Sequence, residues 1–220
     1  EPVERAALYR RVTRDRRLLL VLDNPACADD VLELVIPGTA GGVLVVTRAR
    51  LRALDDAIDV RLGPLAEDEA RVLFGRIAGD DVDLPAALVD RIVRACGWMP
   101  LAVRIAAARL RPPHQVEIDE LVKQLEHPDH SLAALDDGSR SVARTFADSW
   151  SAMPDAQGRL FAVLSVHPGA TFDAWAAATM VDSPVGDVRR ALRGLVDASL
   201  LELAGPERYA FHDLIRSVAA

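Results

Sequence analysis

Two charged side chains follow apolar segments at positions where they could bind a phosphate and its metal ion. The run 18–22 is unbroken and apolar and ends in Asp23, and the run 43–46 is followed closely by Arg48. Parallel strands bring their carboxyl ends to one edge of a sheet, so we expect Asp23 and Arg48 on the same edge. An aspartate there can hold Mg²⁺ through water, and an arginine can reach a terminal phosphate. The alternatives are a turn-capping Asp23 and a surface Arg48.

Two short motifs further along the chain contain Pro100 and His212. Pro100 starts a predicted helix directly after Gly97-Trp98-Met99, and its rigid apolar ring could press against a base. His212 lies between Phe211 and Asp213, ahead of an amphipathic segment. For Pro100, the alternative is a simple break between two helices. For His212, the alternative is a structural histidine followed by an N-cap aspartate.

Several catalytic signatures are absent from the sequence. It contains no G-x-x-x-x-G-K-[ST] loop, no G-x-S-x-G, no H-E-x-x-H and no C-x-x-C. Cys27 and Cys96 are far apart and form neither a disulfide framework nor a metal site, which favours a reducing compartment. No apolar run reaches the roughly 18 residues of a membrane span and no signal peptide is visible, so we expect a cytoplasmic protein without a membrane partner.

The net charge of −7 is concentrated in one segment. Residues 112–139 contain seven carboxylates against Lys123 alone, a local charge of −6, which leaves −1 for the rest of the chain. An acidic balance argues against a chain whose whole surface binds nucleic acid. We interpret the acidity as belonging to a connector between two helical regions.

The apolar periodicity predicts an α/β region followed by two helical regions. Residues 1–65 alternate helix and strand, with strands at 18–23, 43–46 and 58–62, which indicates an incomplete parallel sheet of the P-loop type. Residues 66–138 predict a small helical bundle. Residues 139–220 predict helices at 144–153, 154–164, 172–180 and 184–199, and then a hairpin, which together describe a winged helix.

The order of these motifs resembles the NB-ARC module of STAND-type signalling NTPases, found in plant disease-resistance proteins and in the apoptotic protease-activating factor. The closest resemblance is to SARP-type bacterial transcriptional regulators. The segment 18–24 resembles the Walker B strand, 43–48 the sensor strand, 97–102 the GxP motif and 211–213 the MHD motif. The resemblance covers nearly the whole chain.

This resemblance implies a role for each residue. Asp23 would hold the Mg²⁺ of the nucleotide through water, and Arg48 would sense the γ-phosphate. Pro100 would contact adenine, and His212 would contact the β-phosphate of ADP, with support from Asp213. The implied function is a regulatory switch, closed with ADP and open with ATP, in which the open form can self-associate. Its partners would be an upstream P-loop, a separate DNA-binding domain and downstream repeats of the same protein.

Three departures from the family pattern limit the expected chemistry. Asn24 occupies the position of a second acid, and Val46 and Thr47 stand where the family usually has two hydroxyl residues, of which Thr47 alone supplies one. The sequence also starts beyond the expected P-loop, which supplies most phosphate donors. We therefore expect at most a slow ATPase in the full-length protein, and weak or no binding of ADP, ATP and Mg²⁺ by these 220 residues alone.

Two other functions remain open from the sequence. The first is DNA binding through the winged helix, because the predicted helix 184–199 carries Arg189, Arg190 and Arg193. Residues 141–220 hold seven arginines against nine acids, a local −2, which argues against direct DNA contact. The second is a protein-interaction scaffold whose NTPase has decayed, which Asn24 and the missing loop favour.

Overall fold

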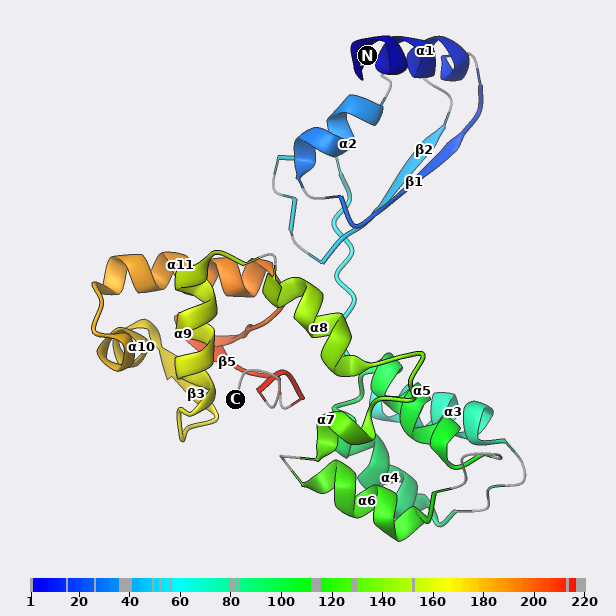
Figure 1. Ribbon diagram of the computed structural model, residues 1–220, viewed down its shortest axis with the longest axis vertical. Helices are drawn as coiled ribbons and strands as arrows, with labels where there is room; N and C mark the ends of the chain where they lie inside the picture. Colours follow the sequence, from blue (N-terminus) through cyan, green and yellow to red (C-terminus); the bar gives the residue numbers. More distant parts are fainter. Residues whose placement is uncertain are drawn as a thin grey trace. The chain divides into compact units, whose positions relative to one another are not determined.

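The computed structural model shows a chain of mixed helix and sheet (Figure 1). It describes residues 2–14, 16–25, 27–35, 41–48, 50–51, 53–55, 57–79, 82, 84–111, 116–127, 130–151, 153–212 and 214–216. The chain divides into two compact units, Glu1–Val60 and Arg61–Ala220, and each is described by itself. None of the described helices is both long and apolar enough to cross a bilayer.

The first unit is a two-stranded parallel sheet with two helices. Its elements are α1 (Pro2–Thr13), β1 (Leu19–Asp23), α2 (Ala28–Leu34) and β2 (Gly42–Val46). The register pairs Leu19 with Gly42 and Asp23 with Val46, which confirms the parallel pairing expected from the sequence. The Tyr9 hydroxyl donates a 3.1 Å hydrogen bond to the carbonyl of Leu34 and so ties α1 to the end of α2.

One face of this sheet is exposed in the described part of the first unit. Leu19 and Val21 on β1 are 69% and 54% exposed, and Leu44 and Val46 on β2 are 52% and 50% exposed. These side chains share a face because alternate residues point the same way and the two strands are paired in parallel. An unbroken apolar run is typical of a strand that is buried on both faces, but nothing in the described unit covers this layer.

The third predicted strand, 58–62, is also absent. The described residues 57–62 are irregular, and Ile58, Val60 and Leu62 are 71–93% exposed. Alternation of apolar and polar residues predicts a strand only where a neighbouring strand pairs with its backbone, and here no such neighbour is present among the described residues. The described residues between β2 and this segment likewise contain no helix.

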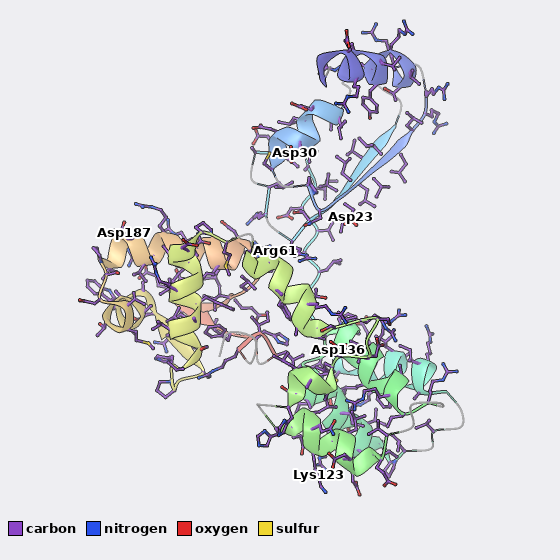
Figure 2. The ribbon with its side chains drawn as sticks, viewed as in Figure 1. Asp23, Asp30, Arg61, Lys123, Asp136 and Asp187 are labelled. Carbon is purple, nitrogen blue, oxygen red and sulfur yellow. The ribbon has the colours of Figure 1, made fainter. Side chains whose placement is uncertain are left out.

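The second unit begins with five helices around a shared core. They are α3 (Glu67–Ala78), α4 (Ala86–Ala95), α5 (Pro100–Arg109), α6 (Ile118–Glu126) and α7 (Ser131–Ala134). Phe74, Ile92, Ile105, Leu121 and Leu135 are almost fully buried at its centre. The acidic segment is thus more than a connector, because α6 buries an apolar face in this core while Lys123 and the acids of α6 remain exposed (Figure 2).

The remainder of the second unit packs helices around a small antiparallel sheet. Its elements are α8 (Val142–Ser151), α9 (Asp155–Ser165), β3 (Thr171–Asp173), α10 (Ala174–Val181), α11 (Val185–Asp197), β4 (Glu202–Gly205) and β5 (Arg208–Ala210). The sheet order is β3-β5-β4. Phe161, Leu164, Leu192 and Leu195 are fully buried between the helices.

The structure corrects the sequence prediction at Phe172 and Asp173. Both were expected in a helix, but Phe172 pairs with Tyr209 of β5 and lies in β3. Asp173 ends this strand and caps α10, because its carboxylate accepts hydrogen bonds from the backbone N–H groups of Trp175 (3.0 Å) and Ala176 (2.8 Å). Helix α10 consequently starts two residues later than the apolar pattern indicates.

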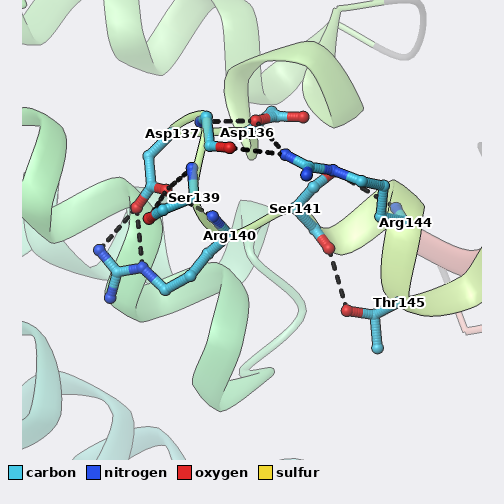
Figure 3. Close-up of polar contacts among 8 residues, drawn as sticks. Asp136, Asp137, Ser139, Arg140, Ser141, Arg144 and Thr145 are labelled. Carbon is cyan, nitrogen blue, oxygen red and sulfur yellow. Dashed lines mark hydrogen bonds and ion pairs between the residues drawn. The ribbon is translucent and has the colours of Figure 1, made fainter.

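A polar turn joins α7 to α8 (Figure 3). The carboxylate of Asp137 accepts hydrogen bonds from the backbone N–H of Arg140 (2.7 Å), the Ser139 hydroxyl (2.8 Å) and the Arg140 guanidinium (2.8 Å). Asp136 accepts a hydrogen bond from Gly138 N–H (2.7 Å) and pairs with Arg144 of α8 (3.3 Å). Burial opposes the ionisation of Asp137, but these hydrogen bonds outweigh it and lower its pKa to about 2.

Candidate functional site

Asp23 and Arg48 lie at the same edge of the sheet in the first unit. Asp23 is the last residue of β1, and its side chain is exposed (Figure 2). It pairs with Val46 of β2, and Arg48 follows Val46 by two residues. Asn24 continues the pairing, since its N–H donates a 2.7 Å hydrogen bond to the Val46 carbonyl in a left-handed conformation (φ 55°). The carboxyl ends of the two strands therefore lie at one edge of the sheet, where Asp23 ends β1 and Arg48 follows β2.

In the second unit, His212 contacts the backbone of Gly97. The imidazole Nε2 lies 3.0 Å from the Gly97 carbonyl oxygen, while Nδ1 is buried and has no hydrogen-bond partner among the described residues. A Cβ atom at Gly97 would overlap the imidazole ring, and Gly97 has a φ of 58°. Both the close approach and the left-handed backbone require glycine at this position.

Backbone hydrogen bonds to several segments fix the turn that contains Gly97. Gly97 N–H donates to the Arg94 carbonyl (2.8 Å) and Trp98 N–H to the Val93 carbonyl (3.1 Å), which closes the end of α4. The Trp98 carbonyl accepts a 3.0 Å hydrogen bond from Leu65 N–H, and its buried indole Nε1 has no partner. Trp98 itself has a φ of 54°, so the turn is a strained segment fixed by its surroundings.

Pro100 lines a cleft beside this turn. It is the first residue of α5, it is exposed, and it borders a cleft of about 340 Å³. The other lining residues are Leu65, Asp68, Glu69, Val72, Leu73 and Arg76. Because proline lacks an N–H, it opens the helix without leaving a donor unsatisfied and turns its ring outward. An apolar cleft with a few polar groups is the usual form of a small-molecule site.

The structure also limits which residues can do chemistry here. Burial raises the pKa of the Cys96 thiol to about 12, so this cysteine next to Gly97 stays protonated and is no nucleophile at neutral pH. Among the described residues, no group of three or more histidine, cysteine, aspartate or glutamate side chains is placed to hold a metal ion. Asp213, predicted to support His212, lies outside the described residues.

The contact between Gly97 and His212 could not be found from the sequence. The two residues are 115 positions apart, and no local pattern pairs them. The available signal was weaker: a glycine directly after a helix indicates a left-handed cap, which allows another group to approach the backbone closely.

The chain is homologous over nearly its whole length to a segment of much longer regulatory proteins. It is 41% identical over 219 residues to the regulatory protein AfsR of Streptomyces coelicolor, and 38% identical over 220 residues to AfsR of Streptomyces griseus. Each match covers 98% of this chain and 22% of the relative, so the chain spans about a fifth of these proteins.

A more distant match joins the chain to a plant protein. A disease resistance protein of Arabidopsis thaliana is 29% identical over 119 residues, which is 50% of this chain and 12% of that protein. No family model matches the chain.

Proposed function

We propose that this chain is the switch region of a larger regulatory protein, closed when ADP is bound and open when ATP is bound. The homology to AfsR supports the regulatory role, and the partial match to a plant disease resistance protein supports the NB-ARC resemblance. The observation that carries the proposal is His212, whose Nε2 is held by Gly97 while its buried Nδ1 lacks a partner in the part of the chain that the structure describes.

The unpartnered Nδ1 of His212 is the natural contact for a phosphate. Leaving a buried polar atom without a hydrogen bond costs about 1–3 kcal/mol, so such atoms mark a ligand or a water. Because Nε2–H donates to the Gly97 carbonyl, protonation of the ring puts a second N–H at Nδ1. An imidazolium N–H donated to the β-phosphate of ADP is a charge-assisted hydrogen bond, which is stronger than a neutral one.

The other predicted residues supply complementary contacts. Pro100 and the apolar cleft beside it offer a flat surface to adenine. Asp23 would hold Mg²⁺ through water and Arg48 would contact the γ-phosphate of ATP, which the ADP state lacks. The sequence contains no Walker A loop, so the main phosphate donors must come from outside these 220 residues. With Asn24 after Asp23, hydrolysis in the full-length protein would be slow at most.

The switch follows from where His212 sits in the chain. It comes directly after the sheet β3-β5-β4, and it contacts the turn between α4 and α5. ADP bound to Nδ1 would therefore favour the arrangement in which these two parts of the second unit touch. Exchange for ATP would remove this stabilisation of the closed arrangement. The C-terminal part would then be released and could take part in self-association.

Direct DNA binding by α11 has less support. Arg189 pairs with Glu207 (3.3 Å), and Arg190 pairs with Asp187 (3.4 Å), which lies on the same helix (Figure 2). Two arginines that could contact phosphates are thus beside carboxylates, which oppose a nucleic-acid backbone. We propose that any DNA contact of the whole protein is made by another of its regions.

The test is a calorimetric titration of the full-length protein with ADP. We expect binding by the wild type, and at least tenfold weaker binding by His212→Ala, because a charge-assisted hydrogen bond is lost. The matched control is His127→Ala, an exposed histidine of the same unit, which should bind as the wild type does. A wild type that gives no binding heat and carries no bound adenine nucleotide would refute the switch and favour the scaffold.

A further inference from the structure

We propose that Asp68 selects adenine at the Pro100 cleft by accepting a hydrogen bond from the exocyclic amino group of the base. This inference rests on the proposed nucleotide switch and adds a residue that determines base specificity. It starts from the polar groups that line the cleft, which are Asp68, Glu69 and Arg76.

Asp68 is the carboxylate of this turn that remains available. Glu67 is paired with Arg71 at 2.6 Å, and Arg71 also binds Asp90 of α4. The Glu69 carboxylate is already bound at the start of α3, where its Oε2 accepts a 3.0 Å hydrogen bond from Ala66 N–H. The exposed carboxylate of Asp68 forms no hydrogen bond or ion pair with the described residues, and its charge acts on Arg71 of the same helix only at longer range.

Asp68 and Pro100 both line the cleft. The hydrogen bond from Leu65 N–H to the Trp98 carbonyl joins the approach to α3 to the turn before Pro100. Asp68 is one helical turn beyond Leu65, whereas Arg76 lies eight residues further on, about 12 Å along α3. A base stacked on Pro100 would therefore lie closer to Asp68 than to Arg76.

The acidic end of the cleft suits a base better than a phosphate. Glu67, Asp68 and Glu69 form the first turn of α3 and together repel anions. A purine ring is neutral and can stack on apolar surface, and its edge can donate a hydrogen bond. We infer that the base lies at this end and that the phosphates extend away from it.

The chemistry of a carboxylate then decides which purine is accepted. An ionised aspartate only accepts hydrogen bonds. Adenine carries an amino group at C6, which donates, whereas hypoxanthine and guanine carry a carbonyl oxygen there, which would face the carboxylate without a proton. Sites built for one hydrogen-bond pattern reject the analogue that leaves a polar group unpaired.

The test compares ADP with inosine diphosphate, which differs at C6, in calorimetric titrations of the full-length protein. We expect the wild type to prefer ADP by about tenfold or more. Asp68→Asn should reduce this preference to about threefold or less, because an amide can also donate to the carbonyl. Glu67→Gln is the matched control, since it removes one charge from the same turn without lining the cleft, and it should keep the wild-type preference.

The outcomes separate this inference from the switch itself. If the wild type binds ADP but Asp68→Asn keeps the full preference for ADP, the role of Asp68 is wrong and the switch stands. Equal loss of preference in Glu67→Gln would also overturn it, because the effect would then be one of general charge. A wild type that binds neither nucleotide would refute the switch on which the inference rests.

Discussion

The imidazole of His212 occupies the space that a side chain at position 97 would fill. Its Nε2 lies 3.0 Å from the Gly97 carbonyl oxygen although the residues are 115 positions apart in the chain. The contact joins the turn between α4 and α5 to the segment that follows β5. It leaves the second ring nitrogen, Nδ1, buried and unpartnered, which makes this histidine both a link within the second unit and a candidate ligand contact.

The first prediction concerns Gly97→Ala in the 220-residue chain. The added methyl group collides with His212 and requires a left-handed alanine, so we expect a loss of at least about 2 kcal/mol in the free energy of unfolding. Urea unfolding followed by tryptophan fluorescence measures it. Trp98, Trp150 and Trp175 all lie in the second unit, so this signal reports on that unit alone.

A double-mutant cycle tests whether His212 is the cause. In a His212→Ala background the collision is gone, and Gly97→Ala should cost only the backbone strain, about 1 kcal/mol. Additive losses in the two single variants and the double variant would show that Gly97 and His212 are not in contact.

The second prediction concerns the pH dependence of stability at Asp137. Its pKa is lowered from 3.8 to about 2 by hydrogen bonds that outweigh the effect of burial. A lowered folded-state pKa adds stability above the unfolded pKa, which is lost as pH falls toward 2. Asp137→Asn should therefore be less stable than the wild type by about 1–2 kcal/mol at pH 7, and this difference should shrink between about pH 4 and pH 2.

Unfolding by urea at several pH values gives this difference directly. The control is Asp187→Asn, because that carboxylate is largely exposed and paired only with Arg190 at 3.4 Å. A stability difference for Asp137→Asn that is the same at pH 7 and pH 2 would contradict the assigned role of its charge.

The third prediction concerns the bare face of the first unit. Leu44 is half exposed beside Val21 on this face, so the 220-residue chain should bind a hydrophobic dye such as ANS. Leu44→Thr introduces a β-branched strand former and removes apolar surface, and it should reduce ANS fluorescence. Val166→Thr, an exposed valine directly after α9, is the control and should reduce it less. Equal reductions would mean that the sheet is not the dye-binding surface.

The sequence predicts the helices of the second unit well, because their apolar faces repeat at helical spacing and become the buried core. The buried residues at this spacing include Phe74, Ile92, Leu192 and Leu195. Periodicity fails where a long-range partner decides the outcome. The segment around Val60 alternates like a strand but has no strand beside it.

In the candidate site, too, short-range features could be predicted from the sequence and long-range contacts could not. Asp23 and Arg48 could be placed at one sheet edge because their strands are adjacent and parallel, which is a short-range property. Motif order led to Pro100 and His212, but the contact between His212 and Gly97 depends on how separate helices pack. No local signal reveals that packing, and none showed that Asp68 alone of its turn would be left unpaired.

The most direct test of the account is the rate at which bound ADP leaves the full-length protein. A fluorescent ADP analogue is bound, and its release is followed after an excess of unlabelled ADP is added. If His212 closes the ADP state, release from His212→Ala should be at least tenfold faster than from the wild type, and His127→Ala should match the wild type. Equal release rates for the wild type and His212→Ala would contradict the claim that this histidine holds the nucleotide.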